Sequence, residues 1–164
     1  MIVVVSHERD DHAHEVLAAL ARMGRGGELV DTAAYPRSAS ITQHFGSQGT
    51  SATVSSGRRR IDLTTAGAVW WRRPQSFTLH DGIDPDVAGF AYSECHEAVS
   101  GLWASLDTSW VNPPALDEAA HHKPYQLKVA GEVGLPVPRT VITNDPGAAR
   151  AFAAELGPGR TVYK

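Results

Sequence analysis

Lys123 is the residue whose position in the sequence most favours a chemical role. It directly precedes Pro124, and proline is favoured in the first turn of a helix, so we expect Lys123 to be extended at a helix N-terminus. A cation there opposes the helix dipole by roughly a few tenths of a kcal/mol unless an anion, usually phosphate, lies in front of it. His121 and His122 could add donors to such a site. The local pattern alone favours the simpler interpretation, a solvated lysine preceded by polar loop residues.

Three further candidates follow the ends of expected strands. His7 lies in the loop after the first strand, and Arg72 and Arg73 follow a later one. Ligands bind α/β sheets at the carboxyl ends of parallel strands, so these side chains could contact a substrate. The planar fork of arginine suits carboxylates, including those of a peptide. Polar surface loops are the alternative interpretation for all three residues.

Several common catalytic and metal-binding patterns are missing from the sequence. No glycine-rich dinucleotide or phosphate fingerprint follows the first strand. His12 and His14 are two residues apart, so on a helix they do not face one another, and no HExxH or paired-cysteine spacing accompanies them. Cys95 lies next to His96 on the apolar side of an expected helix and fits inert core. We therefore predict no metal site within this sequence.

The composition is that of an ordinary globular protein. The 164 residues are 42% hydrophobic and 20% charged, and the net charge of −3 disfavours nucleic-acid binding. The single cysteine excludes an internal disulfide and favours a reducing compartment. There is no apolar run of about 18 residues and no signal peptide, so we expect a cytoplasmic protein without a membrane span.

The first 112 residues predict a Rossmann-like α/β domain, with a mostly parallel sheet flanked by helices. Continuous β-branched or apolar runs indicate the strands, and apolar residues at spacings of three and four behind a capping aspartate indicate the helices. Pro113 and Pro114 favour a domain boundary. The expected strands are residues 2–5, 28–31, 68–71 and 110–112, and the expected helices follow Asp10 or Asp11, and Asp84. The apolar stripe of the second helix is Val87, Ala91, Cys95, Ala98, Leu102 and Leu106.

Residues 38–65 differ from the rest of this domain because they are rich in Ser, Thr and Gly with short alternating pieces. This pattern predicts an inserted antiparallel ribbon with glycines at its turns. The arginines at 58–60 could meet an acidic peptide or could charge an edge strand against aggregation. We favour the edge role.

The pattern of residues 113–164 predicts a second region that contains both helices and strands, as in an α+β fold. The expected helices are residues 116–120, 124–133 and 146–156, and the expected strands are residues 140–143 and 161–164.

The order of these pieces resembles the start of an ATP-grasp ligase, and more narrowly the ribosomal-peptide maturases of the microviridin-ligase or graspetide type. The resemblance implies that residues 1–112 form a pre-ATP-grasp domain and residues 113–164 the beginning of an ATP-grasp domain. The segments that carry it are Val-Trp-Trp-Arg-Arg-Pro at 69–74, Trp-Val-Asn-Pro at 110–113, Lys123, Gly-Leu-Pro-Val-Pro-Arg-Thr at 134–140 and Val-Tyr-Lys at 162–164.

The resemblance implies that Lys123 and Lys164 contact the nucleotide and neutralise phosphate charge. It also implies ATP-dependent activation of a peptide Asp or Glu as an acyl phosphate, which a Ser or Thr hydroxyl or a Lys amine attacks to close a macrocyclic ester or amide. ATP and Mg²⁺ are the implied cofactors. The metal ligands of the family are a Glu and an Asn late in the ATP-grasp domain, and they do not transfer to this sequence. We therefore expect the 164-residue chain to be inactive alone and to belong to a longer ligase.

A precursor peptide is the implied partner, and a homodimer is a second expectation from the resemblance. Two other functions stay open at this point. One is an ATP-grasp ligase of the glutamate-ligase or glutathione-synthetase type, and the other is a non-catalytic module that binds a peptide or a partner protein.

Overall fold

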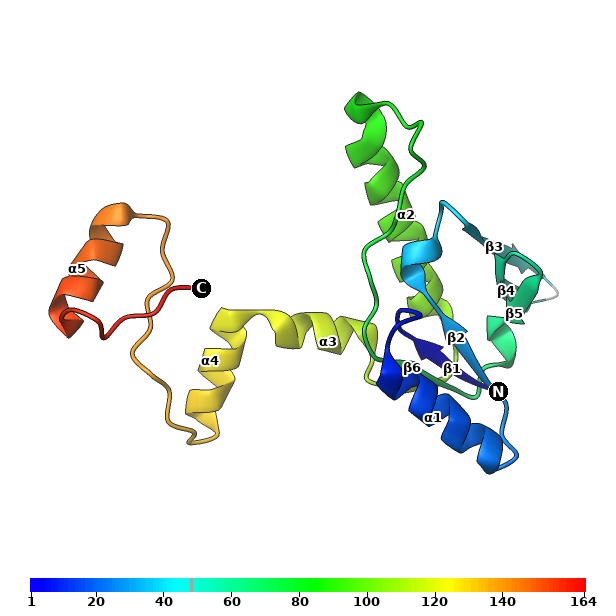
Figure 1. Ribbon diagram of the computed structural model, residues 1–164, viewed down its shortest axis with the longest axis horizontal. Helices are drawn as coiled ribbons and strands as arrows, with labels where there is room; N and C mark the ends of the chain where they lie inside the picture. Colours follow the sequence, from blue (N-terminus) through cyan, green and yellow to red (C-terminus); the bar gives the residue numbers. More distant parts are fainter. Residues whose placement is uncertain (48) are drawn as a thin grey trace. The chain divides into compact units, whose positions relative to one another are not determined.

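The computed structural model describes residues 1–47 and 49–164 (Figure 1). The chain forms two compact units, Met1–Pro114 and Ala115–Lys164. The predicted domain boundary after residue 112 stays a prediction. Within the described residues, no helix is long and apolar enough to cross a membrane.

A parallel sheet forms the centre of the first unit. Its strands are β1 (Ile2–Val5), β2 (Gly27–Val30), β6 (Ala68–Trp71) and β7 (Ser109–Val111), in the order β2-β1-β6-β7. The β1 run Ile-Val-Val-Val suits a strand that is covered on both faces, and Val3, Val4 and Val5 are fully buried. The predicted α/β fold with a mostly parallel sheet is therefore confirmed.

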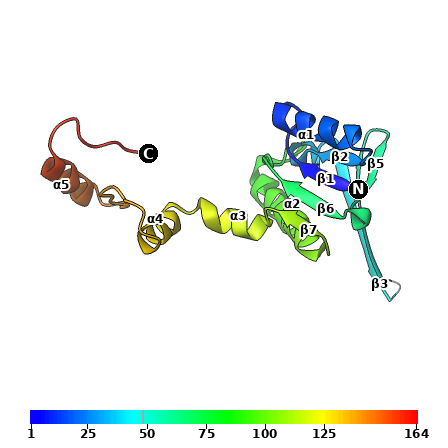
Figure 2. The same ribbon diagram turned by 90° about the horizontal axis from the view of Figure 1, so that it is seen from below.

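Helix α1 (Asp11–Arg22) connects β1 to β2. Asp10 caps it by accepting a hydrogen bond from the backbone N–H of His12 at 3.2 Å, as expected for an aspartate at this position. Gly24 follows the helix with φ +68°, a conformation that glycine adopts without a Cβ penalty. Figure 2 shows α1 on the face of the sheet opposite α2 (Pro85–Ser105).

Helix α2 begins as the sequence predicts, with Asp84 accepting from the N–H of Asp86 at 2.9 Å. Its predicted stripe is only partly buried, because the first turns of the helix extend beyond the sheet (Figure 1). Leu102 is fully buried, whereas Val87 is 51% exposed. Val99 and Trp103 complete the buried face of α2, and neither belongs to the predicted stripe.

The predicted antiparallel ribbon is confirmed. It consists of β3 (Ala39–Gly46), β4 (Gly49–Ser56) and β5 (Arg59–Asp62), in the order β3-β4-β5. Opposite residues Ile41, Val54 and Ile61 line one face and contribute to the hydrophobic core. Alternation of apolar and polar residues thus turns one side of the ribbon inward.

The core of the first unit lies between the parallel sheet, α2 and the inner face of the ribbon. Three tryptophans pack there edge to face, with ring centroids 5.8–6.5 Å apart, a favourable geometry for aromatic pairs. They are Trp71, Trp103 and Trp110.

The second unit consists of helices without a sheet. Its elements are α3 (Pro114–His121), whose first residue belongs to the first unit, α4 (Lys123–Glu132) and α5 (Pro146–Leu156). The strands predicted at 140–143 and 161–164 are not formed, so these two predictions are wrong. A strand needs a second strand beside it to pair its backbone N–H and C=O groups. Residues 115–164 contain no strand that could pair with either segment. Val162 is consequently 95% exposed.

Replacing Leu102 with alanine should remove about 2–5 kcal/mol from the free energy of unfolding, because it leaves a cavity under the sheet. Phe90 on the same helix is 70% exposed, so Phe90→Ala should change this free energy by no more than about 0.5 kcal/mol. Urea unfolding measures both. Equal losses for the two variants would contradict the assignment of the buried face of α2.

Candidate functional site

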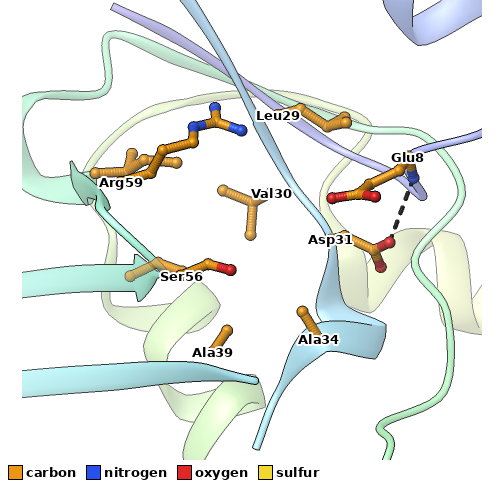
Figure 3. Close-up of a pocket in the computed structure, with 10 residues that line it drawn as sticks. Glu8, Leu29, Val30, Asp31, Ala34, Ala39, Ser56 and Arg59 are labelled. Atoms are coloured by element: carbon orange, nitrogen blue, oxygen red, sulfur yellow. Dashed lines mark hydrogen bonds between the residues drawn. The ribbon is translucent and has the colours of Figure 1, made fainter. Parts of the chain in front are cut away.

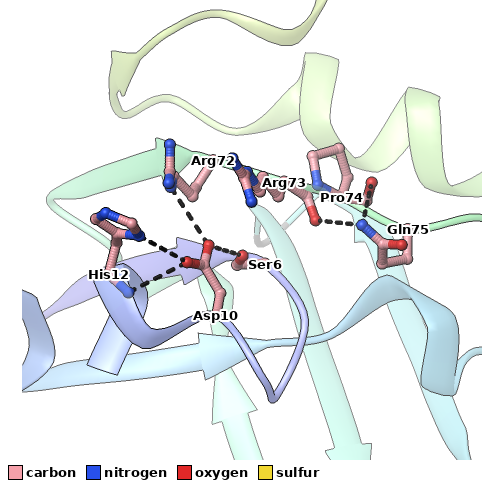
Figure 4. Close-up of polar contacts among 7 residues, drawn as sticks. All are labelled: Ser6, Asp10, His12, Arg72, Arg73, Pro74 and Gln75. Carbon is pink, nitrogen blue, oxygen red and sulfur yellow. Dashed lines mark hydrogen bonds and ion pairs between the residues drawn. The ribbon is translucent and has the colours of Figure 1, made fainter. Parts of the chain in front are cut away.

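The carboxyl ends of β1 and β6 define the candidate site. β2 pairs with one side of β1 and β6 pairs with the other side. The order of the strands therefore reverses at β1, which makes this point a topological switch point. Ligands bind open α/β sheets at such a switch point, outside the carboxyl ends of the strands. The loop from Ser6 to Asp10 follows β1, and the segment from Arg72 follows β6 (Figure 4).

A buried carboxylate holds these two loops together. The side chain of Asp10 is 1% exposed. Its Oδ2 accepts a hydrogen bond from the Ser6 hydroxyl at 2.6 Å and lies 3.3 Å from Nε of Arg72. Figure 4 shows the Ser6 and Arg72 side chains converging on this carboxylate from β1 and β6.

These contacts lower the pKa of Asp10 from 3.8 to about 2. The hydrogen bond from Ser6 is the largest cause, and burial opposes it. The charge of Arg72 and the backbone N–H groups of Ala13 and His12 lower the pKa further. Because hydrogen bonds and a nearby cation favour the ionised form, Asp10 is a carboxylate at neutral pH.

Arg72 is held in one orientation by contacts on two sides. Its guanidinium carbon lies 5.6 Å from the ring centroid of Trp70, while Nε faces Asp10. The side chain is 24% exposed. Within the described part of the chain, its terminal nitrogens have no hydrogen-bond partner, so they can donate to a planar acceptor such as a carboxylate.

The backbone after β6 is fixed as firmly as the Arg72 side chain. The N–H groups of Arg72 and Arg73 both donate to the carbonyl of Val5, at 3.0 and 3.2 Å. Gln75 exchanges two hydrogen bonds with the Thr32 hydroxyl, at 2.7 and 2.9 Å, and so ties this segment to the loop after β2. The loops that follow three strands are thereby fixed relative to one another.

The structure brings His7, Arg72 and Arg73 to the same edge of the sheet, as predicted from their positions after strands. Arg73 is exposed and His7 is half-buried. Within the described residues, neither side chain forms a hydrogen bond or ion pair, and no such bond joins either of them to the side chain of Arg72. Their role in binding stays a prediction.

Sequence reasoning did not identify Ser6 and Asp10 as a pair, because it treated Asp10 only as a helix cap. The available signal was a hydroxyl at the end of a buried strand followed four residues later by an aspartate. Asp10 performs both roles, since Oδ1 caps α1 and Oδ2 accepts from Ser6.

A hollow of about 100 Å³ lies between the end of β2 and the base of the ribbon (Figure 3). Glu8 and Asp31 stand on one side, with the N–H of Glu8 donating to Asp31 at 3.3 Å. Arg59 stands on the other side, where it forms an ion pair with Glu28. The apolar lining consists of Leu29, Val30, Ala34, Ala39, Val54 and Ile61, and Ser56 adds a hydroxyl.

In the second unit, Lys123 lies at a helix N-terminus, as the sequence predicts. The expectation that Lys123 itself is extended is wrong, because it is the first residue of α4 and the extended N-cap position belongs to His122. Nζ of Lys123 donates to Oε1 of Gln126 at 2.8 Å. The N-cap residue His122 makes no side-chain capping hydrogen bond, so the first turn combines a cation with N–H groups that fit a phosphate. Lys164 is exposed and forms no hydrogen bond or ion pair within the described residues.

The histidine pair of α1 does not converge on a common point. Nε2 of His14 contacts the carbonyl of Glu8 at 2.6 Å, whereas Nδ1 of His12 lies 3.6 Å from Asp10. Among residues 1–47 and 49–164, no group of three or more His, Cys, Asp or Glu side chains is placed to hold a metal ion.

The first unit is thus a Rossmann-like α/β domain whose switch point carries arginines. The model of the MvdD pre-ATP grasp domain family matches residues 1–118. The chain belongs to this family.

Solved structures agree with this assignment. Macrocyclase MdnB from Microcystis aeruginosa MRC is similar with a TM-score of 0.86 and 29% identity, over 94% of this chain and 51% of that one. MdnC from the same organism, bound with precursor peptide MdnA, has a TM-score of 0.84 and 30% identity over the same shares. ATP-grasp ligase PsnB, complexed with minimal precursor, Mg and ADP, has a TM-score of 0.67 and 30% identity, over 95% of this chain and 52% of that one.

This chain therefore spans about half the length of the solved ligases that it resembles. No curated protein matches its sequence.

Replacing Asp10 with asparagine should weaken the acid dependence of folding. The folded pKa of about 2 lies below the ordinary 3.8, so the ionised group stabilises the fold above about pH 4, and this contribution is lost as the pH falls toward 2. Asp10→Asn should lack this loss and should be less stable than the original chain at pH 7. Denaturant unfolding between pH 2 and pH 7 measures it.

Asp11 is the matched control, because it is exposed and lies outside the Ser6 and Arg72 contacts. Asp11→Asn should leave the slope of stability against pH close to that of the original chain. Parallel pH profiles for the original chain and Asp10→Asn would mean that the carboxylate does not stabilise the fold through its charge.

Proposed function

We propose that this chain is the N-terminal half of an ATP-dependent ligase that closes macrocycles in a ribosomal precursor peptide. Such a ligase joins a side-chain carboxylate of the peptide to a hydroxyl or an amine. The observation that carries the proposal is the similarity to MdnC bound with its precursor peptide, at a TM-score of 0.84 over 94% of this chain.

Lys123 and Lys164 are proposed to hold the phosphates of the nucleotide. The position of Lys123 at an uncapped helix N-terminus supports this role, since the ammonium group and the first N–H groups both attract anions. ATP, when bound with Mg²⁺, supplies the phosphoryl group that activates the carboxylate. The protein side chains neutralise phosphate charge and orient it. The magnesium ligands belong to the part of the ligase beyond this chain.

The first unit is proposed to form the peptide side of the active site. Arg72, Arg73 and His7 lie at the switch point of the sheet, where they would bind carboxylates of the peptide. The contacts of Arg72 with Asp10 and Trp70 support this role, because a pre-oriented guanidinium loses less side-chain freedom on binding.

The two alternative functions are less well supported. The solved ligases that are 29–30% identical to this chain are peptide macrocyclases or are complexed with peptide precursors, which does not favour a glutamate-ligase or glutathione-synthetase activity. The match extends past the first unit to cover 94–95% of the chain, so a peptide-binding module without a nucleotide lobe is not favoured either. A cytoplasmic location and a homodimer complete the proposal.

Lys123→Ala in the full-length ligase should greatly weaken nucleotide binding and stop ring formation, because a phosphate loses its cationic partner. Calorimetric titration with ATP and Mg²⁺ measures binding, and mass spectrometry of the precursor peptide measures the loss of one water per ring. Lys128→Ala is the control, since Lys128 lies on the same helix and pairs with Glu132 at 3.6 Å. Unchanged binding in Lys123→Ala would refute the nucleotide role.

Arg73→Ala in the same ligase should weaken binding of the precursor peptide about 10- to 100-fold, because hydrogen bonds to charged groups contribute about 1.5–3 kcal/mol. Nucleotide affinity should not change. Fluorescence anisotropy of a labelled peptide measures the difference. Arg22→Ala provides the control, because Arg22 is exposed in the last turn of α1 and away from the switch point. An equal effect of both substitutions would remove Arg73 from the site.

A further inference from the structure

The hollow between the end of β2 and the base of the ribbon combines an apolar lining with charged side chains. Its volume is about 100 Å³. Val30 and Val54 belong to the apolar part of the lining and are 4% and 8% exposed. Glu8, Asp31 and Arg59 are the charged residues around it (Figure 3). Small-ligand pockets are usually built in this way, from apolar walls and a few polar groups.

The charges around this hollow are not balanced. Arg59 forms an ion pair with Glu28, so its charge is already matched. Asp31 accepts hydrogen bonds from the backbone N–H groups of Ala33 at 2.9 Å and of Glu8 at 3.3 Å. Within residues 1–47 and 49–164, the Glu8 carboxylate forms no hydrogen bond or ion pair, and Asp31 has no cationic partner. Two negative charges are therefore left for a positively charged ligand to match.

The size of the hollow distinguishes between the cationic side chains of proteins. An apolar cavity of about 150 Å³ holds benzene, so a space of about 100 Å³ holds about four heavy atoms. The compact ammonium of lysine and the outer part of its four-carbon stem match this size, whereas the larger planar guanidinium of arginine leaves its stem outside. The methylenes of lysine also bury readily against apolar walls while the ammonium stays beside polar groups.

The hollow lies at the same edge of the parallel sheet as the switch point. β1 and β2 are parallel, and Glu8 and Asp31 belong to the loops that follow their carboxyl ends. Arg72 and Arg73 follow β6, which pairs with the other side of β1. This edge of the sheet therefore carries arginines on one side of β1 and unmatched carboxylates on the other.

We propose that the hollow binds a lysine side chain of the precursor peptide, with its stem against the apolar lining and its ammonium beside the carboxylates of Glu8 and Asp31. The inference rests on the proposed function, because it adds a basic residue to the acidic ones that Arg72 and Arg73 would bind. Opposite charges on the two sides of β1 fix the direction in which the peptide crosses this edge.

An NMR titration of the isotope-labelled 164-residue chain at low salt tests the proposal with capped tripeptides. Acetyl-Gly-Lys-Gly-amide should shift the backbone N–H signals of the residues that line the hollow. The same tripeptide with norleucine keeps the stem without the ammonium, and it should bind roughly fivefold more weakly, as the loss of an exposed ion pair implies. The arginine tripeptide should also bind more weakly than the lysine tripeptide. n-Butylammonium, which is the lysine side chain alone, should bind more weakly than the tripeptide.

Two variants separate the charge of the hollow from its shape. Glu8→Gln removes a carboxylate, so it should weaken binding of the lysine tripeptide roughly fivefold and leave binding of the norleucine tripeptide unchanged. Ser56 is exposed and its side chain points into the hollow (Figure 3). Ser56→Leu should therefore fill the space and stop binding of both tripeptides while the carboxylates remain. Glu15→Gln is the matched control, because Glu15 is exposed on α1 and does not line the hollow.

Four results would overturn the proposal. They are an absence of shifts among the lining residues, equal binding of the lysine and norleucine tripeptides, binding of the arginine tripeptide at least as tight as that of the lysine tripeptide, and equal effects of Glu8→Gln and Glu15→Gln. Butylammonium that binds as tightly as the lysine tripeptide would identify a free amine as the ligand and would remove the peptide. Failure of the ligase proposal is separate, because it is read from ring formation and nucleotide binding in the full-length ligase.

Discussion

The arrangement of the candidate site depends on the buried carboxylate of Asp10. A charge removed from water must be matched by hydrogen-bond donors or by an opposite charge. The Ser6 hydroxyl after β1 and the first turn of α1 supply donors, and Arg72 after β6 supplies the opposite charge. One side chain therefore fixes where the helix starts, how the two loops approach each other and how Arg72 points. The arrangement of side chains at the switch point follows from this requirement as much as from the strand order.

The first unit was largely predictable because its signals are local. The β-branched run of β1, the capping aspartates before α1 and α2, and the alternation in the ribbon each specify an element without knowledge of the rest. The extent of burial along α2 was not predictable in this way, since Val87 and Leu102 fit the same periodic stripe and differ only in what lies beneath them. The pairing of Ser6 with Asp10 likewise depends on a turn geometry that composition does not reveal.

The second unit shows the opposite case. Thr140 to Thr143 and Thr161 to Lys164 are rich in residues that favour strands, yet they form none. Strand propensity describes how well a residue fits a sheet whose other members are present, so it could not decide these two segments. The position of Lys123 was predictable because a proline and the helix signal behind it are sufficient, whereas a role for Lys164 depends on partners outside its own segment.

The packing of the tryptophans has a practical consequence for spectroscopy. All four tryptophans of the chain, Trp70, Trp71, Trp103 and Trp110, belong to the first unit. Tryptophan fluorescence, excited at the red edge of the protein absorbance, therefore reports on that unit alone. The aromatic residues of the second unit are two tyrosines and Phe152. Since two units need not unfold together, tryptophan fluorescence followed in parallel with circular dichroism, to which the helices of both units contribute, would show whether the second unit melts separately from the first.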